Sequence, residues 1–136
     1  MPLLKTYDIF LSHAWAYHSD YYSVQRFLND APSFRWRNYS VPEHDPLQPH
    51  SPFALREQLK RQIRPVNVVL ILSGMYVAHS SWIQFEIDFA NALSKPMIGV
   101  RPWGQQRVPL AVKHSVKEMV GWQTESIVSA VRRWAI

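Results

Sequence analysis

Eight residues at positions 66–73 read VNVVLILS, and six of them are aliphatic. The apolar side chains follow one another without the alternation that is typical of a strand with one wet face. A central strand of a parallel sheet has this pattern, because helices cover both of its faces. The segment therefore predicts an α/β fold built around a buried parallel strand.

The rest of the chain alternates between strand and helix patterns. Strands are predicted at residues 7–12, 35–41, 66–73, 96–101 and 116–122. Helices are predicted at residues 21–28, 53–64, 80–93 and 124–134. The stretch 42–52 holds four prolines and is expected to be an irregular loop. Five strands alternating with helices predict an open, doubly wound parallel sheet, with 7–12 and 66–73 as neighbouring central strands.

Composition limits what the chain can be. Its 136 residues, 47% of them hydrophobic, predict a single domain over residues 1–136 with a core of its own. The absence of cysteine excludes disulfides, a thiol nucleophile and Cys-based zinc sites. Neither a signal peptide nor an apolar run long enough to span a bilayer is recognisable. We expect a cytoplasmic protein that does not enter a membrane.

The net charge of +5 raises the question of nucleic acid. The clearest basic stretch is 55–64, where Leu55, Leu59 and Ile63 form one line at helical spacing. Arg56, Lys60 and Arg64 form a second line on the outer side. The solvated face of an amphipathic helix explains this pattern, and no nucleic-acid motif accompanies it. Nucleic acid is therefore not an expected partner.

Glu86 stands among apolar residues of the helix at 80–93. At helical spacing Trp82, Glu86, Phe89 and Leu93 share one face, and Ser81 with Gln84 is predicted to form a capping box. A carboxylate in such a place costs free energy unless it is paired, hydrogen-bonded or at the edge of a pocket. Glu86 is therefore either a structural ion-pair member or a functional carboxylate.

Several polar and aromatic residues follow the predicted strands directly. In open parallel sheets, ligands bind beyond the carboxyl ends of the strands. This rule brings together segments 12–15, 42–52, 73–76 and 101–104 with Trp122, and Glu86 lies close to the same edge.

Other ligand chemistries are disfavoured. The turn after residues 7–12 has no glycine for a dinucleotide or Walker loop. Asp8 stands at the wrong end of its strand for a phosphoacceptor aspartate, and no histidine pair has metal-ligand spacing. We expect no metal and no bound cofactor.

Three segments resemble TIR domains. YDIFLSH at 7–13 resembles their first box, and WIQFE at 82–86 is similar to the Trp-x-x-x-Glu segment of TIR domains that cleave NAD. NYSVP at 38–42, the segment 66–73 and VGW at 120–122 resemble the TIR-like proteins of the bacterial Thoeris anti-phage system, the ThsB family. The similar segments extend in order over nearly the whole chain.

The resemblance implies a flavodoxin-like TIR fold with helices on both faces of a five-stranded parallel sheet, order 2-1-3-4-5. It implies an enzyme that cleaves NAD, its substrate, at the nicotinamide–ribose bond. The nucleotide made from ADP-ribose, cyclic or conjugated, would then signal to an effector protein. Glu86 matches the catalytic glutamate of the family. The expected substrate contacts are Phe10, Ser12, His13, Ser40, Asp45, Tyr76 and Trp82.

Two departures from the family concern the substrate site. Ala14 and Trp15 stand where many TIR NADases have basic residues, and the loop at 42–52 is rich in proline instead of glycine. A homo-oligomer is expected on activation, because control must come from outside the domain or from between copies of it. The alternative is a TIR-like interaction module without catalytic activity, in which Glu86 belongs to an ion pair.

Overall fold

A single parallel sheet organises the molecule. The computed structural model describes residues 5–12, 19–39, 52–73, 80–101 and 109–136. Its five strands are all parallel and lie in the order β2-β1-β3-β4-β5. They are β1 (Thr6–Ser12), β2 (Arg35–Asn38), β3 (Val68–Leu72), β4 (Met97–Val100) and β5 (Glu118–Val120). The order confirms the predicted flavodoxin-like topology.

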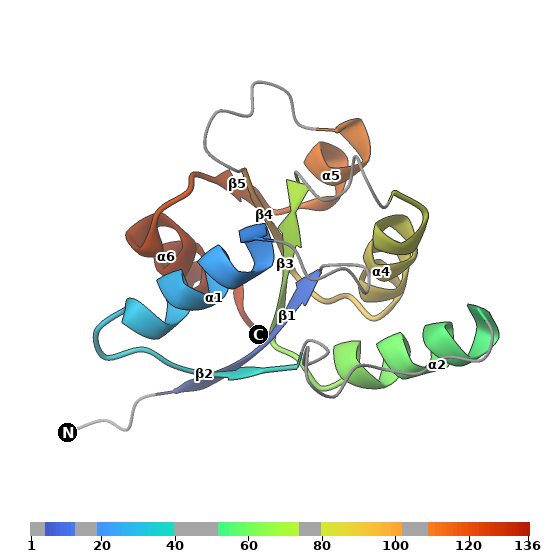
Figure 1. Cartoon of the computed structure of the whole chain (residues 1–136), viewed down its shortest axis with the longest axis horizontal. Helices are drawn as coiled ribbons and strands as arrows, with labels where there is room; N and C mark the ends of the chain where they lie inside the picture. Colours follow the sequence, from blue (N-terminus) through green and yellow to red (C-terminus); the bar gives the residue numbers. More distant parts are fainter. Residues whose placement is uncertain (1–4, 13–18, 40–51, 74–79, 102–108) are drawn as a thin grey trace.

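Helices cover both faces of this sheet. They are α1 (Ser19–Asp30), α2 (Pro52–Ile63), α4 (Ser80–Ala92), α5 (Leu110–Ser115) and α6 (Thr124–Trp134). Figure 1 shows α1 and α6 together on one side of the sheet, and α2 and α4 on the other. Among the described helices, none has the length and apolar character that a membrane crossing requires.

The two central strands lie side by side, as predicted. Register pairs run from Ile9 with Val68 to Ser12 with Ile71. All five residues of β3 have no exposed surface, and neither have Ile9, Phe10 and Leu11 of β1. Each such side chain contributes about 1.5–3 kcal/mol to folding when it is removed from water. The β1–β3 pair is therefore the centre of the hydrophobic core.

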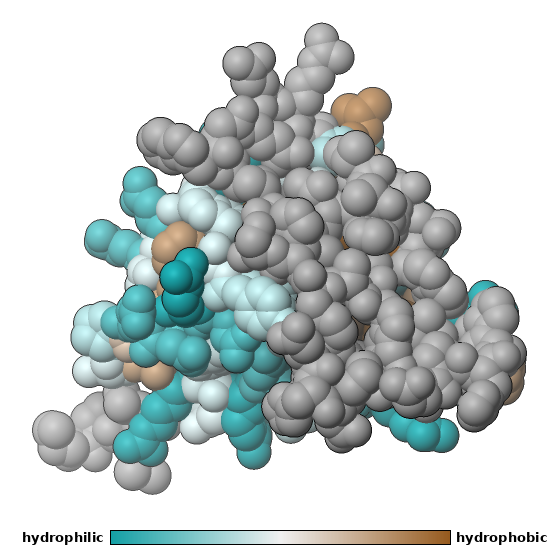
Figure 2. Space-filling view, viewed as in Figure 1, coloured by the Kyte–Doolittle hydropathy of each residue, from teal (hydrophilic) through white to brown (hydrophobic). Residues whose placement is uncertain are grey.

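The outer helices turn their apolar lines to this core. Buried residues are Tyr21, Val24 and Leu28 in α1, Leu59 and Ile63 in α2, and Ile127, Val128 and Val131 in α6. The described residues over α1 and β2 form a mainly hydrophilic surface on the face shown in Figure 2. The predicted buried line of α2 is confirmed at Leu59 and Ile63; the side chain of Leu55 is not described.

Asp8 lies near the amino end of β1, far from the edge where a phosphoacceptor would stand. Its two carboxylate oxygens accept hydrogen bonds of 2.6 and 3.0 Å from Arg37 of β2. This pairing raises the pKa of the Arg37 guanidinium. The carboxylate therefore joins an edge strand to the centre of the sheet.

Some predicted boundaries were wrong. The strand at 66–73 begins only at Val68, because the amide of Val66 still bonds to the carbonyl of Ile63 at the end of α2. The last strand has three residues instead of seven. No helix was predicted at α5, which has six residues and a single buried one, Val112. One buried side chain gives no helical periodicity to recognise.

The end of α4 contains a backbone conformation that L-residues rarely adopt. Ser94 has a φ of 56°, and the amide of Lys95 bonds to the carbonyl of Ala90 over 2.9 Å. This is the Schellman pattern, in which the left-handed position is normally a glycine. Ser94 therefore occupies this position at a cost that glycine would avoid.

We predict that Ser94→Gly stabilises the protein by about 0.5–1 kcal/mol. Glycine relieves the strain of the left-handed conformation, and this gain exceeds the extra backbone entropy that glycine loses on folding. Urea unfolding measures the difference. The matched control is Ser129→Gly, an exposed position inside α6, where the same change should cost about 0.5 kcal/mol. Equal destabilisation by both variants would contradict the cap assignment.

Candidate active site

The carboxyl ends of β1 and β3 meet at one edge of the sheet. Ser12 is the last residue of β1, and Ile71, its register partner, is followed two positions later by Ser73. The chain segments after both strands therefore start next to each other. This edge is the place where the sequence predicts the ligand site.

Register and hydrogen bonds show which face of the sheet Ser12 occupies. The side-chain amide of Asn38 donates a hydrogen bond of 3.0 Å to the hydroxyl of Tyr21 in α1, so the side chain of Asn38 faces α1. Asn38 pairs with Ile9, which therefore faces α1 as well. Because side chains alternate along a strand, Phe10 and Ser12 face the opposite layer. That layer contains α2 and α4.

Glu86 is on α4, in the same layer, and its side chain is fully buried. The buried stripe of the helix is Ile83, Glu86, Ile87 and Ala90, at the spacing of one helical face. The predicted apolar face of this helix was therefore wrong at its carboxyl end, at Phe89 and Leu93. Leu93 is 37% exposed, and Phe89 is half-buried at the margin. Glu86 occupies the middle of the buried face instead of its edge.

The start of α4 also differs from the prediction. The helix begins at Ser80, so Ser81 lies inside it and not at a capping position before it. The side-chain amide of Gln84 donates a hydrogen bond of 2.8 Å to the carboxylate of Asp88, one helical turn later. Gln84 and Asp88 thus form an i, i+4 pair on the wetter side of the helix.

Within the described part of the chain, three buried residues are polar or charged: Ser12, Ser73 and Glu86. Ser73 donates its hydroxyl to the carbonyl of Val100, over 3.2 Å, and so connects the ends of β3 and β4. The buried hydroxyl of Ser12 has no hydrogen-bond partner among the described residues. Unsatisfied buried hydroxyls are uncommon, and such a group is available to a ligand that approaches this edge.

The predicted site residues are described to different degrees. Phe10 lies in the core, on the same face as Ser12 and two residues before it. The structure gives the backbone of Trp82 at the start of α4 but not its side chain. His13, Ser40, Asp45 and Tyr76 lie outside the described residues. Their contacts with a substrate stay predictions.

Ser73 was expected at this edge as part of segment 73–76, but it was not among the predicted substrate contacts. The sequence carries a signal for it, because a hydroxyl ends a run of five aliphatic residues. Its role as a connection between two strand ends depends on the carbonyl of Val100, which is 27 positions away. A contact at that separation is not readable from the local pattern.

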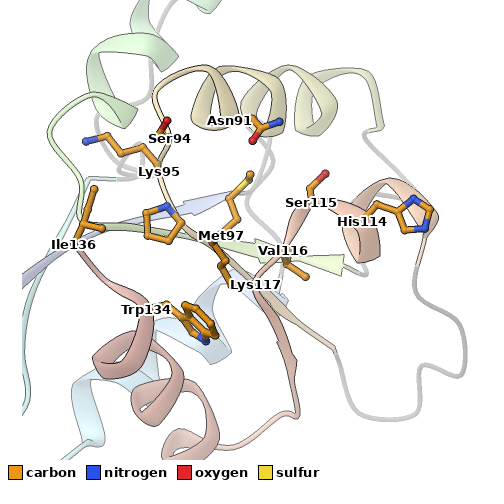
Figure 3. Close-up of a pocket in the computed structure, with 11 residues that line it drawn as sticks. Asn91, Ser94, Lys95, Met97, His114, Ser115, Val116, Lys117, Trp134 and Ile136 are labelled. Atoms are coloured by element: carbon orange, nitrogen blue, oxygen red, sulfur yellow. The ribbon is translucent and has the colours of Figure 1, made fainter.

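A groove of about 580 Å³ lies at the opposite edge of the sheet. Figure 3 shows its lining side chains around Met97, the first residue of β4, with Asn91 of α4, Ser115 of α5 and Trp134 of α6 nearby. Lys117 directly precedes β5. These are amino ends of strands, so the groove is separate from the edge that carries Ser12.

The arrangement near Ser12 suits one kind of chemistry. A buried carboxylate acts in a low local dielectric, where it stabilises a developing positive charge more strongly than in water. Ser12 and Ser73 carry buried hydroxyl groups at the ends of β1 and β3, and hydroxyl groups can orient a polar substrate. Within the described ranges, no group of three His, Asp or Glu residues is placed to bind a metal ion.

The family model described as the TIR-like domain of the Thoeris protein ThsB matches residues 10–107. The match covers well over half of the chain. It begins inside β1, ends after β4 and includes α4 with Glu86. No curated protein matches the chain.

The two serines give a matched pair of variants. Ser73→Ala should cost about 1 kcal/mol, because it removes a buried hydrogen bond to Val100. Ser12→Ala should change the free energy of unfolding by no more than about 0.5 kcal/mol, because no bond among the described residues is lost. Urea unfolding of both variants tests this. A larger loss for Ser12→Ala would show that its hydroxyl is already engaged in the folded protein.

Proposed function

The chain belongs to the family of the TIR-like domain of the Thoeris protein ThsB, and we propose that it cleaves NAD at the bond between nicotinamide and ribose. The observation that carries this proposal is Glu86, a fully buried carboxylate in the layer that Ser12 also faces. The ADP-ribosyl product, cyclised or conjugated, then signals to an effector protein in anti-phage defence.

The chemistry needs few groups. The glycosidic C–N bond breaks, and its electron pair leaves with nicotinamide, which departs as a neutral molecule and needs no acid. The ribose becomes oxocarbenium-like, as in glycoside hydrolysis. A single carboxylate stabilises this cation and accepts hydrogen bonds from the ribose hydroxyls. Water, a group of the same nucleotide or another acceptor then attacks the ribose carbon.

Burial on α4 supports this role for Glu86. Ile83 and Ile87, its neighbours on the buried stripe, have at most 1% exposure. Apolar neighbours keep water away from the carboxylate and strengthen its interaction with a positive ribose. Ser12 supplies a hydroxyl in the same layer, and in our proposal it bonds to the substrate. Trp82, four residues before Glu86, is the proposed aromatic contact.

We predict that Glu86→Gln lowers the rate of NAD cleavage by roughly 100-fold or more, a typical cost of losing one electrostatic stabiliser. The amide keeps the shape of the side chain and removes its charge. Chromatography of released nicotinamide measures the rate, and mass spectrometry of the second product identifies the nucleotide.

Asp88→Asn is the matched control for Glu86→Gln. Asp88 is a carboxylate on the same helix, but it is exposed and bonds to Gln84. The Asn variant should retain the activity of the parent. Equal activity in the Gln variant would refute the catalytic assignment. Loss of folding in the Gln variant alone would favour an ion-pair role and the interaction-module alternative.

We further propose that copies of the domain assemble when the enzyme is active. Uncontrolled NAD cleavage would deplete an essential metabolite, so control between copies is the simplest safeguard. The activity per molecule should then rise with protein concentration or with a crowding agent. Dilution series, followed by nicotinamide release and by light scattering, test this. Constant specific activity from a monomer at every dilution would contradict it.

Asp45→Ala tests whether the proline-rich stretch at residues 42–52 contributes to assembly or to the substrate site. The variant should lose activity while its thermal unfolding stays that of the parent. Asp30→Ala removes an exposed carboxylate at the end of α1 and is the matched control. Equal activity of the two variants would separate the stretch from the reaction.

A further inference from the structure

The outer face of α2 carries a row of positive charge. Arg56, Arg61 and Arg64 are exposed, and Lys60 is half-buried beside them. The amide of Arg64 bonds to the carbonyl of Lys60, so the helical geometry continues through Arg64. Residues 56, 60 and 64 are four positions apart, which spaces their cations roughly 6 Å apart along the axis.

The arginines of this row have no carboxylate partner among the described residues, unlike arginines elsewhere in the protein. Arg37 pairs with Asp8, and Arg133 pairs with Glu118. On α2, Glu57 lies 3.3 Å from Lys60. Among the residues that the structure describes, no carboxylate pairs with the three arginines of the row.

An aromatic pair of α4 adjoins the row. The rings of Phe85 and Phe89 are stacked, with centroids 6.4 Å apart and planes 10° apart, and both are half-buried. The ammonium of Lys60 lies 5.6 Å from the Phe89 centroid, and the guanidinium of Arg64 lies 5.8 Å from it. A ring holds a cation in position without cancelling its charge. The charge of Arg64 is thus not cancelled by its contact with the ring, whereas Lys60 also pairs with Glu57.

We propose that α2, with Phe85 and Phe89, forms a binding surface for single-stranded nucleic acid. Amphipathic periodicity accounts for a solvated basic face, but it does not dictate the stacked rings beside that face. It also does not dictate that the three arginines have no carboxylate partner among the described residues. A cationic track next to aromatic side chains is the combination that binds single strands without sequence preference. Arginine, which supplies three of the four cations, matches phosphate oxygens through its planar fork.

An acidic protein surface is the competing partner. Its carboxylates would be attracted by the same charge, but a carboxylate has no flat ring to place against the aromatic pair, whereas every base of a single strand has one. A second copy of the chain is a poor partner, because its described exposed carboxylates, Asp30, Asp88 and Glu125, are on three different helices. The surface is separate from Glu86, which is buried on the sheet-facing side of α4.

The test uses the full chain and a fluorescein-labelled dT20 oligonucleotide, with anisotropy measured over a range of NaCl concentrations. Arg56→Gln/Arg61→Gln/Arg64→Gln should weaken binding at least tenfold at low salt. It should make the negative slope of log K against log salt shallower by about 2, because three phosphate contacts at about 0.7 each are lost. Arg56→Gln/Arg61→Gln, which leaves both cation–ring contacts intact, should lower the slope by about 1.4.

The matched control is Arg26→Gln/Arg35→Gln/Lys113→Gln, which removes three exposed cations from other elements. It should change the affinity less than threefold. Absence of binding by the parent at low salt, or equal losses in both triple variants, would overturn the proposal. Displacement of dT20 by polyglutamate of equal charge at equal concentration would assign the surface to acidic proteins instead. NAD is absent from these measurements, so their outcome is independent of the proposed cleavage.

Discussion

Burial of β3 on both faces is the constraint from which the other features follow. A strand whose five side chains are all inaccessible needs a helical layer on each side and a neighbour on each edge. These requirements put α1 and α6 on one face, α2 and α4 on the other, and β1 and β4 at its edges. They also bring together the ends of β1 and β3, where the ligand site is predicted.

Glu86 is the exception in this arrangement. A charged group in the interior costs several kcal/mol unless charge or hydrogen bonding compensates it. A leucine at the same position of the α4 stripe would pack without needing such compensation. A buried carboxylate on this stripe is therefore compatible both with the catalytic role that we propose and with the ion-pair role of the alternative.

The sequence predicted those parts of the fold in which local pattern and tertiary packing agree. The continuous apolar run of β3 and the amphipathic lines of α1, α2 and α6 belong to this class. Its predictions were wrong where the pattern is ambiguous. Both faces of α4 carry large apolar residues, so periodicity alone did not distinguish the Phe89 side from the Ile87 side. The structure places Glu86 and Ser12, two of the predicted site residues, at buried positions of α4 and β1. Their roles at a substrate site stay predictions.

Contacts between distant strands set another limit to prediction. Gly99 of β4 is an example, because a methyl group there would collide with the side chain of Met119 on β5. The register pair Gly99–Met119 creates this close packing, and neither residue shows it in its own segment. The hydroxyl of Ser73 and the carbonyl of Val100 are a second case. Such pairs become visible only when the order of the strands is known.

The helices also give the two edges of the sheet different electrostatic character. Helix amino ends carry a partial positive charge and carboxyl ends a partial negative one. The last turns of α2, α5 and α6 contain basic residues that balance the negative ends. The first turns of α2 and α4 contain no acidic residue, so their positive ends are not offset in the same way.

In a parallel α/β fold these positive ends lie at the edge where the strands finish. The pyrophosphate of the proposed substrate would be attracted to that edge by these helix ends. Glu86 lies six residues beyond the start of α4, roughly 9 Å along the axis, where the field of the helix end has faded. In the proposed complex, the positive end of α4 would face the phosphates and Glu86 would face the ribose, which is the polarity that the proposed substrate requires.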